Sequence, residues 1–213
     1  TALNTVSLSG MDKFIEELKK SNFEGDIDIS RETRDFYSHD ASMFELVPIL
    51  VIKPKNSSDI QKLVLLVNKS EGLSLTVRSA GTDMSGGAIS ESIVVDMTTY
   101  LNEIFEVTES SAHAQPGVFY RDFEKRTLEK GALLPSYPAS RDLCSIGGMV
   151  ANNSGGEKSL EHGKTEKFVT KLKVIFSDGN EYEVQPLTKS DLDNKMSQNN
   201  FEGRLYKQLF ELI

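Results

Sequence analysis

The sequence predicts an α+β fold, built as one globular unit of two lobes. Its 213 residues can bury a sizeable core, and domain sizes allow one large domain or two small ones packed together. A strand–helix–strand order early in the chain predicts a βαβ unit, and two later strands joined by a tight turn predict a hairpin. Two glycine-rich segments lie between these regular parts.

The first half of the chain begins with a predicted amphipathic helix over residues 11–20, which Ser9 is placed to cap. Its apolar face is formed by Met11, Phe14, Ile15 and Leu18. Residues 21–45 are polar and irregular. The elements expected next are a buried strand at 49–52, a helix capped by residues 57–59, and strands at 73–77 and 92–96.

The second half predicts shorter elements. They are strands at 103–107 and 111–115, a helix over 119–130 that ends before Gly131, a hairpin of 169–176 and 181–184, and a helical tail after residue 190. Residues 132–163 have little regular pattern and are rich in Pro, Ser, Asn and Gly. A long irregular segment in a compact domain usually carries function.

Charge and composition exclude several classes of protein. The 24 basic and 32 acidic residues leave a net charge of −8, which disfavours general binding to nucleic acid or anionic lipid. The single Cys144 forms no internal disulfide and favours a reducing compartment, so we expect a cytoplasmic protein or one peripheral to the inner face of a membrane. The apolar run 46–52 is too short to cross a bilayer. The chain begins without Met and ends abruptly, which suggests a piece of a longer polypeptide.

Two glycine-rich loops are candidate anion sites. The first, residues 77–87, leaves a strand directly, and its small residues permit a nest of backbone N–H groups. The second, residues 145–156, opens with a short helix at a Gly pair, where backbone N–H groups are accessible. Two such loops suit a ligand with two phosphates and a long body, such as a dinucleotide. An equally simple interpretation is that their glycines only turn the chain.

Other chemistries lack their motifs. No Gly-x-Gly-x-x-Gly follows a strand, and Lys158 stands where a P-loop ending in Gly163-Lys164-Thr165 needs glycine. The three histidines are scattered, so no metal site is expected, and no Gly-x-Ser-x-Gly surrounds a serine. Cys144 is interpreted as a small residue in a turn rather than a reactive thiol.

Several motifs in order resemble the FAD-binding oxidoreductases of the vanillyl-alcohol-oxidase (PCMH) type, especially their 2-hydroxy-acid (D-lactate or glycolate) dehydrogenase branch. The resemblance runs through Asp40 and residues 48–54, 77–87, 94–97, 115–118, 135–140, 145–156, 162–165 and 178–179. It implies a small βαβ lobe followed by a larger mixed or antiparallel sheet lobe with flanking helices, with FAD extended between them. The implied division is a lead-in at 1–45, a first FAD-binding lobe at 46–97 and a second at 98–213, incomplete and without the cap domain that binds substrate.

The resemblance also implies which residues bind FAD. They are Val77, Arg78, Ser79, Ala80, Gly81, Thr82, Asp83, Ser85, Gly86, Gln115, Pro138, Ser140, Ser145, Ile146, Gly147, Gly148, Asn152, Asn153, Ser154, Gly155, His162, Gly163 and Val169. The first loop would wrap the diphosphate, including with Arg78, and Gly163 and Val169 would approach the ribose or adenine. Binding is expected to be non-covalent. Ser79 and Ala80 replace two glycines of the usual motif, and their Cβ atoms would strain the loop if those positions need positive φ.

The implied function is oxidation of a small 2-hydroxy acid by hydride transfer to FAD, with a quinone, an iron–sulfur partner or oxygen as electron acceptor. No catalytic residue is named, because substrate-orienting residues in this family come from the missing part. The alternative is a non-catalytic FAD-binding fragment or subunit that needs a partner chain or cap domain. Other readings are a different flavin reaction on this fold, such as reduction of a nucleotide-sugar enol ether, and a globular α+β domain without a cofactor.

Overall fold

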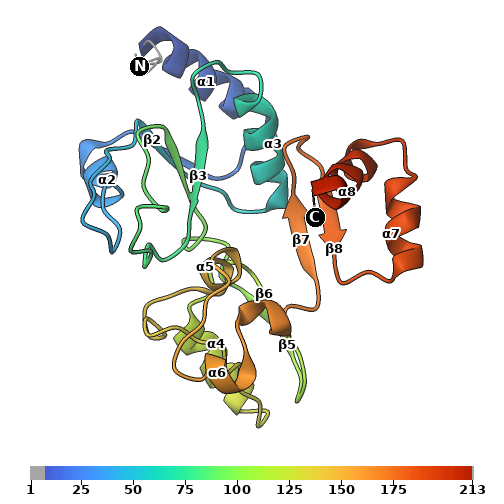
Figure 1. The fold of residues 1–213 in the computed structure, drawn as a ribbon. Helices are drawn as coiled ribbons and strands as arrows, with labels where there is room; N and C mark the ends of the chain where they lie inside the picture. Colours follow the sequence, from blue (N-terminus) through green and yellow to red (C-terminus); the bar gives the residue numbers. More distant parts are fainter. Residues whose placement is uncertain (1–7, 213) are drawn as a thin grey trace.

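The computed structural model describes residues 8–212 and confirms the α+β class (Figure 1). The helices are α1 (Leu8–Lys20), α2 (Arg31–Phe36), α3 (Ser57–Val67), α4 (Tyr120–Leu128), α5 (Ile146–Ala151), α6 (Ser159–His162), α7 (Lys189–Met196), α8 (Phe201–Leu212) and the 3-10 helix η1 (Thr165–Phe168). The strands are β1 (Asp26–Asp28), β2 (Leu50–Lys53), β3 (Leu75–Arg78), β4 (Ile93–Asp96), β5 (Ile104–Val107), β6 (Ala112–Ala114), β7 (Leu172–Ile175) and β8 (Glu181–Val184).

A four-stranded sheet in the order β1-β2-β4-β3 organises the first half. The expected βαβ unit is present as β2, α3 and β3, but β4 lies between its two strands and pairs in parallel with both. All four residues of β4 are buried. A strand that is apolar and covered on both faces takes the central position of a parallel sheet.

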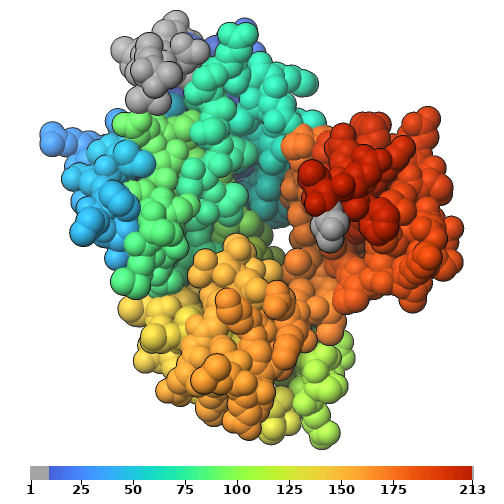
Figure 2. All heavy atoms as spheres, viewed as in Figure 1, coloured from blue at the N-terminus to red at the C-terminus, as the bar shows by residue number. Residues whose placement is uncertain are grey.

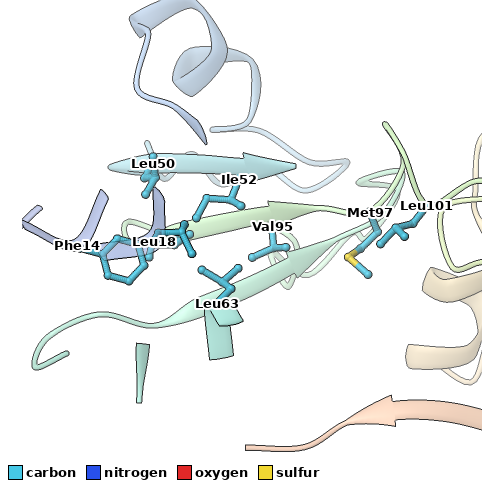
Figure 3. Packing of buried hydrophobic residues seen from close by; sticks show 9 residues of the cluster. Phe14, Leu18, Leu50, Ile52, Leu63, Val95, Met97 and Leu101 are labelled. Carbon is cyan, nitrogen blue, oxygen red and sulfur yellow. The ribbon is translucent and has the colours of Figure 1, made fainter. Parts of the chain in front are cut away.

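Both faces of this sheet are covered. Because side chains alternate along a strand, Leu50 and Ile52 point to one face and Val51 to the other. On the first face they pack with Phe14 and Leu18 from α1 and with Leu63 from α3 (Figure 3). On the opposite face Val51 and Val94 pack with Tyr37, which directly follows α2. The main core is therefore built from α1, α3 and the sheet.

The prediction that residues 21–45 are irregular was partly wrong. It contains β1, which pairs antiparallel with β2, and α2, whose N-cap Ser30 accepts the N–H of Thr33 at 3.3 Å. The sequence gives no apolar signal for β1, because two of its three residues are aspartates and its pairing comes from β2. Two caps also differ: α1 begins at Leu8, so Ser9 lies inside it, and the cap of α3 is Asn56, which accepts the N–H of Asp59 at 3.0 Å.

The second half contains two separate hairpins instead of the larger sheet that was expected. β5 pairs with β6 and β7 pairs with β8, both antiparallel. The predicted strands and the tight turn at 177–180 are confirmed, and Gly179 adopts φ +77° in that turn. β5 to β8 are three or four residues long and partly exposed, so each pairs only with its neighbour in sequence.

The β7–β8 hairpin packs against α3 of the first half. The Gln61 side chain donates to the Gly179 carbonyl at 3.0 Å, and the Asn68 side chain donates to the Ser177 carbonyl. The predicted helical tail is confirmed as α7 and α8, which project to one side of the molecule (Figure 2). No helix within residues 8–212 is both long and apolar enough to cross a membrane.

Asp59 joins three segments at the start of α3, and its removal tests this packing. Its buried carboxylate accepts the N–H of Glu24 at 2.9 Å and of Lys55 at 3.0 Å, and Lys62 lies 3.6 Å away. We expect Asp59→Ala to lower the free energy of unfolding by about 1–3 kcal/mol, because two backbone N–H groups lose a charged acceptor that is itself buried. Urea unfolding followed by circular dichroism measures this. The control Glu16→Gln, at an exposed ion pair, should change stability by less than about 0.5 kcal/mol; equal effects would contradict the role of Asp59.

Candidate functional site

The first loop, residues 77–87, begins at the end of β3 and contains two glycines in the left-handed region. Gly81 has φ +68° and Gly86 has φ +85°. Asn22 and Asn153 are the only other residues between 8 and 212, apart from glycines, with positive φ. Ser79 and Ala80 therefore lie outside the left-handed region, and their Cβ atoms do not strain the loop.

The tip of the first loop is held by its own carboxylate. Asp83 accepts the N–H of Gly87 at 2.7 Å and of Ser85 at 3.1 Å, and these bonds help to keep the pKa of Asp83 below its usual value. The N–H groups at this end are thus already used. At the other end, the N–H groups of residues 79–82 donate to no acceptor within the described part of the chain. These N–H groups remain available to an anionic ligand.

Arg78 points into the protein. Its side chain is buried, and Nη1 donates to the carbonyls of His39 at 2.6 Å and Tyr37 at 3.4 Å. Burial lowers the pKa of Arg78, while Tyr37, Asp40 and Asp96 nearby favour its charged form. The guanidinium therefore contacts the segment before β2 and packs against Gly81 of the first loop.

The second loop, residues 145–156, holds an unusual hydroxyl. Ser145 is buried, and its Oγ is the only buried side-chain polar atom without a partner among the described residues. An unsatisfied buried hydroxyl is costly, so such an atom needs an explanation. The next residues are held in place by the backbone, because the N–H groups of Ile146 and Gly147 donate to the carbonyls of Val118 and Pro116 at 2.9 and 2.8 Å.

The two loops meet around Ser79 and Gly148. A Cβ atom placed on Gly148 would lie 3.6 Å from the Cβ of Ser79 and 3.4 Å from Oγ of Ser145. The hydroxyl of Ser79 in turn donates to the Pro116 carbonyl at 3.4 Å. Ser79 and Gly148, from the two halves of the chain, thus lie close together, and the unpartnered Oγ of Ser145 lies near the same contact.

The end of the second loop is fastened to η1. Asn153 takes the left-handed conformation, its Nδ2 donates to Glu166 at 2.7 Å and its Oδ1 accepts the N–H of Glu166 at 3.0 Å. Thr165 is buried, and its hydroxyl and N–H both donate to the Ser154 carbonyl, at 2.8 and 3.0 Å. Residues 163–165, whose Gly-Lys-Thr sequence does not complete a P-loop motif, therefore support the second loop through Thr165.

A cavity of about 330 Å³ lies beside this end of the loop. It is lined by Val150, Asn153, Glu166, Val169, Thr170, Lys171, Leu172, Val184, Gln185 and Pro186. Of the residues expected from the sequence to bind a cofactor, Asn153 and Val169 line it. The others on its walls were missed: Val150 lies in the second loop but carries no polar signal, and the rest, including Val184 of β8, come from later in the chain and belong to no motif.

Some of the expected residues have their polar atoms engaged elsewhere. The Gln115 side chain accepts the N–H of Glu103 at 2.8 Å, and His162 lies 3.6 Å from Glu161 in an exposed position. Pro138 and Ser140 form a turn through their carbonyls, which accept the N–H groups of Arg141 and Cys144. Sequence reasoning also missed His39, which contributes only a backbone carbonyl to the support of Arg78 and therefore leaves no side-chain signal.

Comparison with known proteins gives these loops a context. The sequence profile of a family described as FAD binding domain matches residues 48–185, which include both loops. D-2-hydroxyglutarate dehydrogenase of Escherichia coli K12 is 27% identical over 202 residues, covering 93% of this chain and 20% of the relative. Glycolate oxidase subunit GlcD of Bacillus subtilis 168 is 30% identical over 168 residues, covering 77% of this chain and 36% of the relative. The chain thus spans well under half the length of either relative.

A solved structure shows the same fold. Xylooligosaccharide oxidase from Myceliophthora thermophila C1 superposes with a TM-score of 0.70 at 18% sequence identity, over 84% of this chain and 38% of the oxidase. At this low identity the likeness concerns the fold alone.

Proposed function

The chain belongs to the FAD binding domain family, and we propose that it is the FAD-binding part of a flavin-dependent oxidoreductase that oxidises a 2-hydroxy acid. The observation that supports FAD as the cofactor is that two glycine-rich loops come into contact within the residues that the family profile matches. The substrate class rests on the names of the two relatives, which are a D-2-hydroxyglutarate dehydrogenase and a glycolate oxidase subunit. A quinone, an iron–sulfur partner or oxygen would accept the electrons.

The residues present fit a dinucleotide. FAD has two phosphates between its ring systems, and the open N–H groups of residues 79–82 provide donors for them. The unpartnered Oγ of Ser145 is a buried hydrogen-bonding group close to the contact between the two loops, 3.4 Å from where a Gly148 Cβ would lie. Gly148 has no Cβ to fill the space between the loops, so a cofactor can approach its backbone.

These positions suggest how the chain would hold FAD. Residues 79–82 would bind the diphosphate through backbone N–H groups, and Ser145 and Gly148 would line the body of the cofactor. The cavity beside Asn153 and Val169 offers a mostly apolar wall for the adenosine end. When bound, FAD would supply the hydride-accepting chemistry that oxidation of a hydroxyl-bearing carbon needs. The chain's own residues bind and orient the cofactor, and groups that recognise the acid would come from sequence corresponding to the rest of the relatives.

Binding is proposed to be non-covalent. Cys144 is buried, and burial raises the pKa of its thiol, which disfavours the reactive thiolate. Its Sγ contacts the Arg141 carbonyl at 3.9 Å. A single buried thiol also fits a reducing compartment such as the cytoplasm.

The purified protein should therefore carry a flavin that denaturation releases. We expect a flavin absorption spectrum before denaturation, and FAD rather than FMN in the supernatant after acid precipitation, because no covalent bond holds it. Mass spectrometry of the precipitated chain should give its unmodified mass. A colourless protein that takes up no added FAD would contradict the cofactor assignment, and flavin retained on the precipitated chain would contradict non-covalent binding.

Gly148 offers a graded test of the two-loop site. A Cβ fits there within ordinary contact distances, so Gly148→Ala should fold normally, whereas Gly148→Val places branched methyl groups between the loops. We expect the Kd for FAD to rise modestly for Ala and by more than about tenfold for Val. Fluorescence titration of apoprotein measures this, with the melting temperature as the folding control. Wild-type affinity in both variants would refute the two-loop site.

A second candidate is a non-catalytic FAD-binding module that depends on a partner chain or further domain. It is favoured because the chain covers only 20% of the length of one relative and 36% of the other. The FAD-loaded chain is mixed with D-lactate, glycolate or D-2-hydroxyglutarate and an artificial electron acceptor. An oxidoreductase complete in this chain predicts dye reduction by at least one acid, and the module predicts retained flavin without dye reduction. A sugar serves as a control for substrate class.

A further inference from the structure

A lead-in loop that precedes the family match packs along the first loop. This lead-in loop, residues 37–46, ends before the matched range begins at residue 48. Its two arms are joined by an antiparallel bridge between His39 and Glu45, and the Leu46 N–H donates to the Ser38 carbonyl at 3.0 Å. The lead-in loop is therefore held together by hydrogen bonds between its own residues.

Three contacts join the lead-in loop to the first loop along its length. At one end, the Ala41 N–H donates to the Gly81 carbonyl at 3.1 Å. At the other end, the Asp40 carboxylate accepts the N–H of Ala88, the residue that follows the first loop, at 3.4 Å. Between them, the Phe44 ring packs against Gly86, where a Cβ would lie 3.1 Å from it. The neighbouring residues Asp40 and Ala41 thus contact the two ends of the first loop, and Phe44 contacts it near Gly86.

Arg78 connects the base of both loops. Its backbone belongs to β3, paired with β4 at Asp96, and its Nη1 donates to the carbonyls of Tyr37 and His39 in the lead-in loop. The guanidinium also lies over the Tyr37 ring, 5.2 Å from the centroid. The guanidinium also fills the space where a Gly81 side chain would be, because a Cβ there would lie 2.7 Å from Cζ.

We propose that Arg78 is a positioning residue for FAD, which clamps the lead-in loop onto the first loop and so holds the open N–H groups of residues 79–82 in place. The inference rests on the proposed function, since the ligand of those N–H groups is the FAD diphosphate. The planar guanidinium can stack its face on a ring while its edge donates to two carbonyls, a geometry that the tetrahedral ammonium of lysine does not reproduce. The cofactor site thus includes a segment outside the matched family range.

The first test is an FAD titration of apoprotein carrying Arg78→Lys or Arg78→Met. We expect the Kd for FAD to rise by about tenfold or more in both variants, because the N–H groups lose their alignment when the clamp is lost. The control is Leu63→Ala, which removes a buried side chain from the core of the same sheet without touching either loop. It should lower the melting temperature at least as much as Arg78→Lys and leave the Kd unchanged in the folded protein.

The outcomes separate the two proposals. If the wild type does not bind FAD, the proposed function itself is contradicted. FAD binding by the wild type with unchanged affinity in folded Arg78→Lys would overturn the clamp alone, as would an equal loss of affinity in Leu63→Ala.

A second measurement needs no variant and stands if both Arg78 substitutions unfold. Hydrogen exchange of the wild-type chain is followed with and without FAD. The clamp predicts that FAD slows exchange in residues 79–82 and also in residues 37–46, which Arg78 joins to the first loop. Protection of residues 79–82 with unchanged exchange in 37–46 would overturn the clamp.

Discussion

The parallel pairing of β4 with β2 and β3 is the constraint on which the rest of the structure depends. Every residue of β4 is buried, and its two neighbours end at the same edge of the sheet because all three strands run in one direction. That edge is where β3 leads into the first loop. The position of the first loop is thus set by the backbone hydrogen bonds and the apolar packing of the sheet, and it does not depend on contacts made by the loop residues themselves.

A buried charge links this sheet edge to the lead-in loop. Removing a guanidinium from water is unfavourable unless its N–H groups find acceptors, and in Arg78 they find the carbonyls of Tyr37 and His39. The Asp96 carboxylate, on the paired strand, accepts hydrogen bonds from Thr98 and Thr99 and thereby shapes the turn that leaves β4. Both strand ends therefore continue into loops that are held by buried polar contacts.

The second loop reaches the first through close backbone packing. Gly147 lies against Pro116 so closely that a Cβ would be 2.5 Å from the proline ring, and its N–H donates to the Pro116 carbonyl. The same carbonyl accepts the hydroxyl of Ser79. One residue between β6 and α4 thus joins the two loops, which explains how segments almost 70 positions apart, Ser79 and Gly148, come into contact.

The sequence by itself determined the elements with strong local signals and the composition of the loops. Alternating or continuous apolar residues predicted most strands and helices of the first half, and the turn residues 177–180 predicted the last hairpin. Tertiary structure alone decided the position of β4 between β2 and β3, the pairing of the polar strand β1, and the inward direction of Arg78. The physical reason is that these features depend on backbone groups and on partners distant in the chain, which residue type does not encode locally. The unpartnered hydroxyl of Ser145 belongs with them, because only the folded chain shows that it is buried.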